Sequence, residues 1–249
     1  MKVIVIIPAA GLGTRMAPVP NGAKSRKKQS APSKQFTELG GTPILIHTLR
    51  KFAAIEAVNE IWIALRENEM EGFRARLQFE AKNVPAKKFE LVSGGEHRQQ
   101  SVEHALNAIT ASPHDIVLVH DAVRPFVTSE IIRDIIAAAE KYGAAIAGLP
   151  AVDTVKQVER TAEGALIKAT IPRASVVMAQ TPQGFRYEVI KKAFDEASAD
   201  GFLGTDEASL VERAGHDVAV VMGSPMNIKI TTPADMRLAE FYLGNSDRH

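Results

Sequence analysis

A short apolar strand that leads directly into a loop of small residues constrains this chain most. Residues 3–7 read Val-Ile-Val-Ile-Ile, a β-branched run about as long as one buried parallel strand. Residues 8–15 then read Pro-Ala-Ala-Gly-Leu-Gly-Thr-Arg. Without bulky side chains, a phosphate or a flat base can lie directly on the backbone, whose N–H groups bind anions where they precede a helix. The pattern predicts an α/β protein with a polyphosphate-binding loop after its first strand.

A glycine-rich loop after a first strand is also typical of dinucleotide-binding domains. Their fingerprint needs a third glycine, which would fall here at Met16, and an acidic residue about twenty positions further on. Instead, residues 17–33 contain no acidic side chain and four basic ones, namely Lys24, Arg26, Lys27 and Lys28. The sequence therefore favours a phosphate-binding loop of another kind.

Composition and charge exclude several classes of function. The net charge of +1 over 249 residues creates no global field that would attract nucleic acid. Because the sequence has no cysteine, disulfides, thiolate nucleophiles and cysteine-ligated metals are excluded. The apolar run at the start is too short for a signal peptide, and no run approaches membrane-spanning length. We therefore expect a soluble cytoplasmic protein without nucleic-acid or membrane partners.

Strand-like and helix-like segments alternate along the rest of the chain. Further strands are expected at residues 61–65, 89–92, 116–119, 144–149, 218–222 and 227–230. Helices are expected at residues 43–53, 67–82, 102–109, 129–142, 187–197 and 205–211, and from residue 232 onward. Residues 151–175 differ, because two alternating segments flank a turn at residues 160–164 and predict a β-hairpin. We predict one Rossmann-like, doubly wound, mostly parallel sheet flanked by helices, in a single domain over residues 1–249 with a protruding β-hairpin arm.

Two further loops carry candidate functional residues. Residues 94–100 form a second small-residue loop before a helix, and Ser101 can either cap that helix or line a site. Asp121 follows the strand at residues 116–119, where open α/β sheets bind ligands, and its carboxylate suits Mg²⁺. A turn or cap role for Asp121 is the alternative. His120 has no second histidine at ligand spacing, so we interpret it as a structural residue.

Short motifs along the whole chain resemble one family of enzymes. In chain order they are AAGxGxRM, Lys-Gln-Phe at residues 34–36, GGExRxxS, HDAVRP, DTVK, TPQ, TDEAS and NIKIT. They resemble the signature of nucleotide-sugar pyrophosphorylases and cytidylyltransferases, and most closely the 2-C-methyl-D-erythritol 4-phosphate cytidylyltransferases. One departure is that the segment between Arg15 and Lys34 is longer here than in the enzymes it resembles.

The resemblance implies a reaction and its cofactor. The expected reaction transfers a cytidylyl group from CTP to 2-C-methyl-D-erythritol 4-phosphate and releases pyrophosphate, with Mg²⁺, in non-mevalonate isoprenoid precursor synthesis. Residue chemistry agrees, because a phosphate monoester is already a nucleophile and needs cations and positioning rather than a general base. Two alternatives stay open: a cytidylyltransferase for another polyol phosphate such as ribitol 5-phosphate, and a non-catalytic sugar-nucleotide sensor.

The resemblance also assigns roles to residues of this sequence. The implied catalytic residues are Arg15, Lys34 and Lys229. The implied nucleotide-binding residues are Ala9, Ala10, Gly11, Gly13, Thr14, Gly95, Glu96, Ser101 and Ala122. The implied substrate-binding residues are Asp121, which would also bind the metal, Arg124, Thr154, Arg173 and Thr181. The arm at residues 151–175 is expected to embrace a second subunit in a homodimer.

The basic segment at residues 17–33 permits two interpretations. Its four cations, with Pro18, Pro20, Gly22 and Pro32, cannot bury a core, so a passive surface loop is one expectation. Because Arg15 and Lys34 flank it, a lid that closes over bound CTP is the other.

Overall fold

The computed structural model describes residues 1–11, 34–80, 87–162 and 164–246. Three predicted site residues, Gly13, Thr14 and Arg15, lie outside the described residues, as does the basic segment 17–33. Their roles therefore stay predictions.

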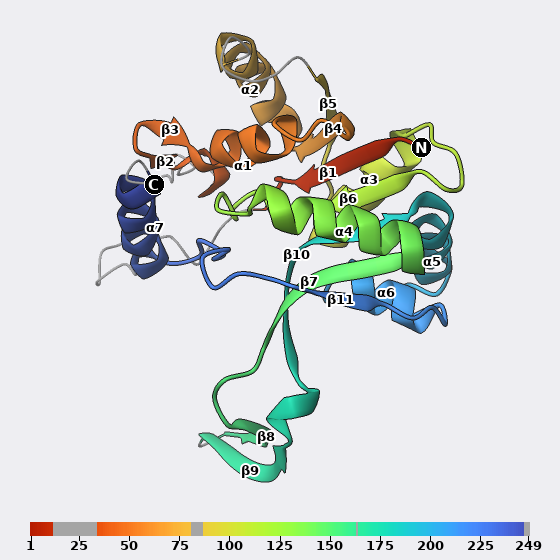
Figure 1. Ribbon diagram of the computed structural model, residues 1–249, viewed down its shortest axis with the longest axis vertical. Helices are drawn as coiled ribbons and strands as arrows, with labels where there is room; N and C mark the ends of the chain where they lie inside the picture. The colour runs from red at the N-terminus through yellow and green to blue at the C-terminus, as the bar shows by residue number, and fades with distance from the viewer. Residues whose placement is uncertain (12–33, 81–86, 163, 247–249) are drawn as a thin grey trace.

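A single seven-stranded sheet forms the centre of the molecule, in the order β11-β7-β10-β6-β1-β4-β5 (Figure 1). Its strands are β1 (Val3–Pro8), β4 (Val58–Leu65), β5 (Lys88–Ser93), β6 (Ile116–Val119), β7 (Ala144–Pro150), β10 (Val177–Arg186) and β11 (Ala219–Met222). The first strand pairs in parallel with both β4 and β6. Strand β10 runs antiparallel to β6 and to β7. The predicted mostly parallel sheet is confirmed.

Helices cover both faces of this sheet, as the alternation of side chains in a strand requires. Val5 and Ile7 of β1 face a core shared with α1 (Ile44–Ala53), α2 (Glu67–Glu80) and α4 (Ser129–Tyr142). Ile4 and Ile6 face the opposite core, which includes side chains of α3 (Arg98–Ala108), α5 (Tyr187–Ala199) and α6 (Glu207–Arg213). The doubly wound architecture expected from the sequence is therefore present.

The segment at residues 227–230 is not the strand that its apolar alternation predicts. It crosses the carboxyl side of the sheet as extended coil, and the Ile230 N–H donates to the carbonyl oxygen of Val123 at 3.0 Å. Ile230 is buried with Leu39 and Ile44, in a small core beside α7 (Pro233–Ser246), β2 (Glu38–Leu39) and β3 (Thr42–Pro43). Packing against this small core replaces strand pairing and leaves Lys229 directed toward the sheet.

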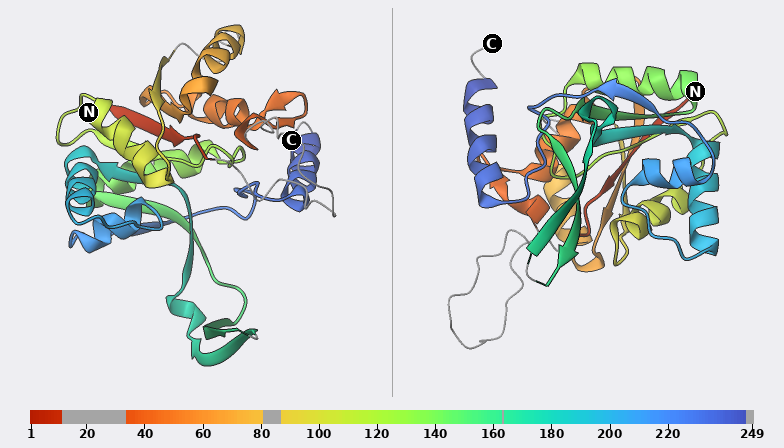
Figure 2. Two further views of the ribbon diagram at one scale, coloured as in Figure 1. Left: turned by 180° about the vertical axis from the view of Figure 1, so that it is seen from behind. Right: turned by 90° about the horizontal axis from the view of Figure 1, so that it is seen from below.

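The predicted arm is confirmed as a two-stranded antiparallel ribbon of β8 (Val155–Thr161) and β9 (Gly164–Ile171). It extends away from the body of the molecule, and the 3₁₀ turn η4 (Arg173–Ser175) leads the chain back toward β10 (Figures 1 and 2). Within the described ranges, no helix is both long enough and apolar enough to cross a membrane.

Candidate active site

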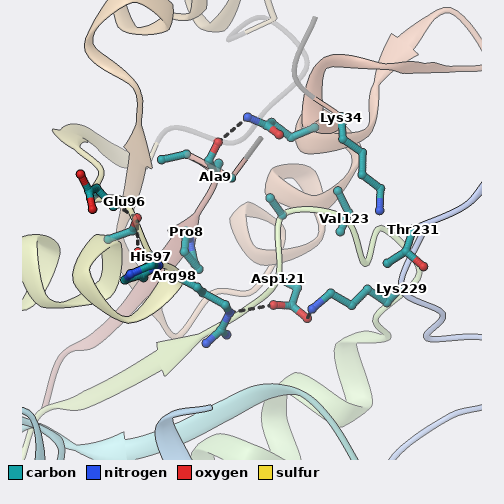
Figure 3. Close-up of a pocket in the computed structure, with 16 residues that line it drawn as sticks. Pro8, Ala9, Lys34, Glu96, His97, Arg98, Asp121, Val123, Lys229 and Thr231 are labelled. Atoms are coloured by element: carbon teal, nitrogen blue, oxygen red, sulfur yellow. Dashed lines mark hydrogen bonds and ion pairs between the residues drawn. The ribbon is translucent and has the colours of Figure 1, made fainter. Parts of the chain in front are cut away.

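A pocket opens at the carboxyl ends of β1, β5 and β6 (Figure 3). The helix after β1 lies on one face of the sheet and the helix before β6 lies on the other, so the direction of winding changes between these strands. Open α/β sheets bind ligands in the crevice at such a point. The pocket is lined by Pro8, Ala9, Ala10, Gly11, Lys34, Gln35, Gly95, Glu96, His97, Arg98, Ser101, Asp121, Ala122, Val123, Lys229 and Thr231.

Small residues after β1 form one wall of the pocket. Two polar side chains fix this loop, because Gln35 Nε2 donates to the Ala9 carbonyl and Arg66 Nε donates to the Ala10 carbonyl at 2.9 Å. A Cβ atom at Gly94 would lie 2.3 Å from Cβ of Ala10, so this contact between the loops after β1 and β5 needs glycine. The fixed loop exposes backbone rather than side chains to a ligand.

Ser101 holds the second small-residue loop together. Its Oγ accepts a hydrogen bond from the Gly95 N–H at 3.1 Å and donates to the His97 carbonyl at 3.1 Å. The helix α3 begins at Arg98, so Ser101 lies inside the first turn and the cap interpretation is wrong. Glu96 is exposed at the mouth of the loop, and its N–H donates to Gln100 Oε1 at 3.0 Å.

Asp121 lies at the end of β6, only 6% exposed, among three cationic side chains. Arg98 Nε contacts its Oδ1 at 3.1 Å, while Arg124 Nε and Lys229 Nζ contact its Oδ2 at 3.2 and 3.0 Å. Figure 3 shows the carboxylate between Arg98 and Lys229. Segments far apart in the sequence therefore converge on one buried anion.

The cations set the charge of this anion. Burial alone would raise the pKa of Asp121, but the positive charges of Arg98, Lys229 and Arg124 hold its pKa well below the usual carboxyl range. Asp121 is therefore ionised at neutral pH and orients the three cations around it.

A hydrogen-bond chain behind the pocket fixes the backbone of Asp121. The Asp121 N–H donates to Thr181 Oγ1 at 3.0 Å, and Thr181 Oγ1 lies 3.1 Å from His120 Nδ1. His120 Nε2 lies 3.0 Å from the Arg124 carbonyl, which can only accept, so Nε2 carries the proton and the threonine hydroxyl donates to Nδ1. Burial lowers the pKa of His120 to about 4, which keeps the ring neutral. The structural interpretation of His120 is confirmed.

The sequence analysis left the role of Arg98 in the GGExRxxS motif open and did not single out Glu207. Arg98 Nη1 contacts Glu207 Oε1 at 2.5 Å, and Glu207 is 1% exposed. Burial would lower the pKa of Arg98, but the charges of Glu207 and Asp121 raise it above its ordinary value. Both residues belong to motifs found in the sequence, Arg98 to GGExR and Glu207 to TDEAS. The sequence alone does not show that these two motifs are in contact.

A second pocket shares Arg98, Asp121 and Lys229 with the first and is otherwise lined by different residues. Arg124 and Thr181 line the second pocket, whereas Lys34 and Ala122 line the first. Its other lining residues are Ala179, Gln180, Gln183, Thr205 and Asp206. The cluster of Arg98, Asp121 and Lys229 therefore borders both cavities.

Thr154 and Arg173 do not join these residues. Both are exposed on the arm and line neither pocket, and Arg173 Nη1 donates to the Val152 carbonyl at 2.9 Å. Within one chain, the structure thus brings together all the described site residues that were predicted from the sequence except these two.

Few side chains of the pocket could bind a metal ion. The described residues contain no cluster of three or more histidine, aspartate or glutamate side chains. A carboxylate has about four acceptor positions, and three on Asp121 are taken by Arg98, Arg124 and Lys229. The remaining position on Oδ1 fits a cation such as Mg²⁺, which commonly binds one or two carboxylates together with substrate phosphates.

Known proteins resemble this chain in both sequence and structure. A relative from Acidobacterium capsulatum, named 2-C-methyl-D-erythritol 4-phosphate cytidylyltransferase, is 58% identical over 98% of each chain. A 4-diphosphocytidyl-2C-methyl-D-erythritol synthase from Anaerococcus prevotii is 29% identical, with a TM-score of 0.78 over 98% of each chain. The cytidylyltransferase from Francisella tularensis is 33% identical, with a TM-score of 0.76 over 97% of this chain and 99% of that one. The family model of 2-C-methyl-D-erythritol 4-phosphate cytidylyltransferase matches residues 3–245, and the chain belongs to this family of nucleotidyltransferases.

Proposed function

We propose that this protein transfers the cytidylyl group of CTP to 2-C-methyl-D-erythritol 4-phosphate and releases pyrophosphate, a step of non-mevalonate isoprenoid precursor synthesis. The observation that supports it is that two pockets with otherwise different linings share Arg98, Asp121 and Lys229. One pocket offers bare backbone to a nucleotide, and the other, lined by Thr181, offers the guanidinium of Arg124 to an acceptor phosphate. The two reactants would meet at Arg98, Asp121 and Lys229.

In the nucleotide pocket, we assign the pyrimidine and ribose to backbone and small side chains of the two loops. These residues are Ala9, Ala10, Gly11, Gly95, Glu96, Ser101 and Ala122. The triphosphate would extend toward Lys34, with Gly13, Thr14 and Arg15 completing the loop. Small residues leave the backbone accessible, and the charged fork of arginine matches phosphate oxygens.

Transfer needs charge stabilisation more than proton transfer. The attacking phosphate oxygen is already an anion, and it must approach the α-phosphorus of a second polyanion. Lys229 lies 3.0 Å from Asp121 Oδ2, and we assign to it and to Lys34 the neutralisation of charge at the reacting phosphates. For Arg15 the same role stays a prediction from the sequence. Preorganised cations of this kind cost no reorganisation during the reaction.

We propose Mg²⁺ as the metal, held by Asp121 Oδ1 and by phosphate oxygens of CTP. Such a cation, when bound, offsets the negative charge of the triphosphate and of the departing pyrophosphate. The single open acceptor position of Asp121 suits an ion that brings further oxygen ligands from the substrate.

We further propose that the protein acts as a homodimer whose arm reaches the partner, with Thr154 and Arg173 completing the acceptor pocket of that partner. Exposed apolar side chains on the ribbon support this, since Leu166 is 60% and Ile167 is 64% exposed. Light scattering at assay concentration tests it, and a fully active monomer would contradict it.

Pyrophosphate release from CTP tests the reaction itself. 2-C-methyl-D-erythritol 4-phosphate and ribitol 5-phosphate are supplied in parallel, with CTP alone as the control. The proposal expects turnover that depends on Mg²⁺ and prefers the methylerythritol phosphate. Preference for ribitol 5-phosphate would change the acceptor, and tight CTP binding without turnover would indicate a sensor.

A further inference from the structure

Glu207 is a buried carboxylate that the reaction described above does not use. Its Oε1 accepts a hydrogen bond from Arg98, and its Oε2 is buried without a partner among the described residues. A buried charge lowers stability unless it is well paired. The question is therefore what this carboxylate does beside Arg98.

The helix that carries Glu207 is tied to the central sheet on both sides of this residue. Gln183 of β10 donates from Nε2 to Asp206 Oδ2 at 2.7 Å, and its Oε1 accepts from the Ala208 N–H at 3.0 Å. Asp206 also caps α6, because its Oδ1 accepts from the Ser209 N–H at 3.0 Å. These bonds make the Glu207 carboxylate a fixed point to which Arg98 attaches.

Arg98 divides its donors between two carboxylates. A guanidinium commonly pairs with one carboxylate through two parallel N–H bonds. Here Nη1 donates to Glu207 Oε1 at 2.5 Å, while Nε donates to Asp121 Oδ1 at 3.1 Å. Because Glu207 holds one end of the guanidinium, Arg98 makes a single bond to Asp121. A second N–H bond from Arg98 to Oδ1 would take the last acceptor position of Asp121.

We infer that Glu207 is a positioning residue that anchors Arg98 and thereby keeps one acceptor position of Asp121 open toward the pocket. It acts through Arg98 and touches neither reactant. It also balances charge, since the three cations Arg98, Arg124 and Lys229 then face two carboxylates instead of one. The activity tests of this inference rest on the proposed function, but its structural test does not.

The substitution Glu207→Gln keeps the shape of the side chain and removes its charge. The neutral amide oxygen of glutamine still accepts from Arg98 but holds it less strongly, so Arg98 can make a second bond to Asp121, and we expect kcat to fall about tenfold or more, as for outer-shell partners of other charged sites. The KM for CTP should stay within about twofold, because the base-binding loops are untouched. Glu212→Gln, the same change at an exposed position of α6, is the matched control and should behave like the parent.

A double-mutant cycle with Arg98→Ala separates positioning from a general structural role. If Glu207 acts through Arg98, Glu207→Gln should lower kcat by less than about twofold when Arg98 is already absent. Equal losses in the two backgrounds would overturn the inference. If Glu207→Gln does not fold, Glu207→Asp replaces it, because the shorter side chain keeps the charge and withdraws the contact.

A crystal structure of the folded Glu207 variant provides a readout without activity. We expect two N–H bonds from Arg98 to Asp121 in the variant and one in the parent. An unchanged single bond from Nε would overturn the inference. If the parent shows no cytidylyl transfer, the proposed function fails, whereas the Arg98 geometry in the variant still decides the role of Glu207.

Discussion

Asp121 in the pocket and Arg173 on the arm are both charged residues predicted to contact the acceptor, but their surroundings differ. Asp121 is 6% exposed and bonded to Arg98, Arg124 and Lys229. Arg173 is exposed and donates to one backbone carbonyl of its own arm. The pocket fixes its charges within one chain, whereas the arm presents a charge that has no pocket of its own. The difference agrees with our proposal that the arm contacts a second subunit.

The packing of the two regions supports the same conclusion. Several pocket residues directly follow β1 and β6, whose side chains are buried in hydrophobic cores on both faces of the sheet. An isolated two-stranded ribbon is only marginally stable in water, and consecutive residues of a strand face opposite sides. Leu166 and Ile167 are adjacent and both exposed, so each face of the arm carries an apolar side chain. Burial against a second copy would stabilise these residues.

The largest expected effect comes from removing the anion that organises the pocket. Asp121→Asn leaves three cations without their shared partner, so kcat should fall about a thousandfold. Breaking a buried charge cluster should also lower the free energy of unfolding by about 3–5 kcal/mol. Pyrophosphate release and urea unfolding measure the two effects, with exposed Asp134→Asn as control. Near-normal turnover would show that Asp121 is not a functional residue. The contrast between the charges in the pocket and the charge on the arm would then be weaker.

Substitution of Lys34, a cation in the nucleotide pocket, should have the next largest effect. Lys34 is 9% exposed and lines the nucleotide pocket. If it stabilises charge at the α-phosphorus, Lys34→Ala lowers kcat about a hundredfold and changes CTP affinity less. Steady-state kinetics and calorimetric CTP binding separate the two quantities. Lys51→Ala, an exposed lysine on α1, is the control, and a selective loss of CTP affinity would contradict a transition-state role.

Gly95→Ala tests the rigidity of the nucleotide loop. A Cβ atom there would lie 2.4 Å from Cβ of Gln100, so either the loop or α3 must shift. We expect the KM for CTP to rise about tenfold, since overpacking of this kind costs about 1–3 kcal/mol. Gly72→Ala, where nothing lies within 4 Å, is the matched control. An unchanged KM would show that the loop can shift without loss of CTP binding.

A charge placed on the arm should act on association rather than on folding. Ile167→Lys should weaken dimerisation roughly fivefold, because it removes an apolar contact at a protein interface. The free energy of unfolding of the body should not change. Sedimentation and activity over a dilution series measure the effect, and Tyr142→Lys, an exposed position of α4, is the control. If both variants dimerise as tightly as the parent, the arm is not the dimer contact.

The smallest effect concerns acid stability. The folded-state pKa of Asp121 is lowered, so its contribution to stability is present above the unfolded value of about 3.9 and is lost as the pH falls below it. The free energy of unfolding should therefore fall less steeply below about pH 4 in Asp121→Asn than in the parent. Urea unfolding between about pH 5 and pH 3 checks this, and equal slopes would exclude Asp121 as an acid-sensitive group.

Local patterns were sufficient for most of the fold. The apolar run at residues 3–7, the helical stripes and the alternating hairpin correspond to β1, the covering helices and the arm. Such elements are encoded by periodicity over a few residues. Residues 227–230 show where this fails, because an alternating pattern can bury its apolar side chains in a small core without any strand partner.

By itself, the sequence determined most of the elements, the positions of the small-residue loops and the family, because those depend on the types and spacing of neighbouring residues. Only the tertiary structure decided how the charges are arranged around Asp121. Arg98, Asp121, Glu207 and Lys229 lie in separate motifs, and their contacts arise where strand ends meet a crossing segment and the start of α6. Local periodicity carries no information on such distances. The partners of a buried charge are set by the packing of the whole sheet.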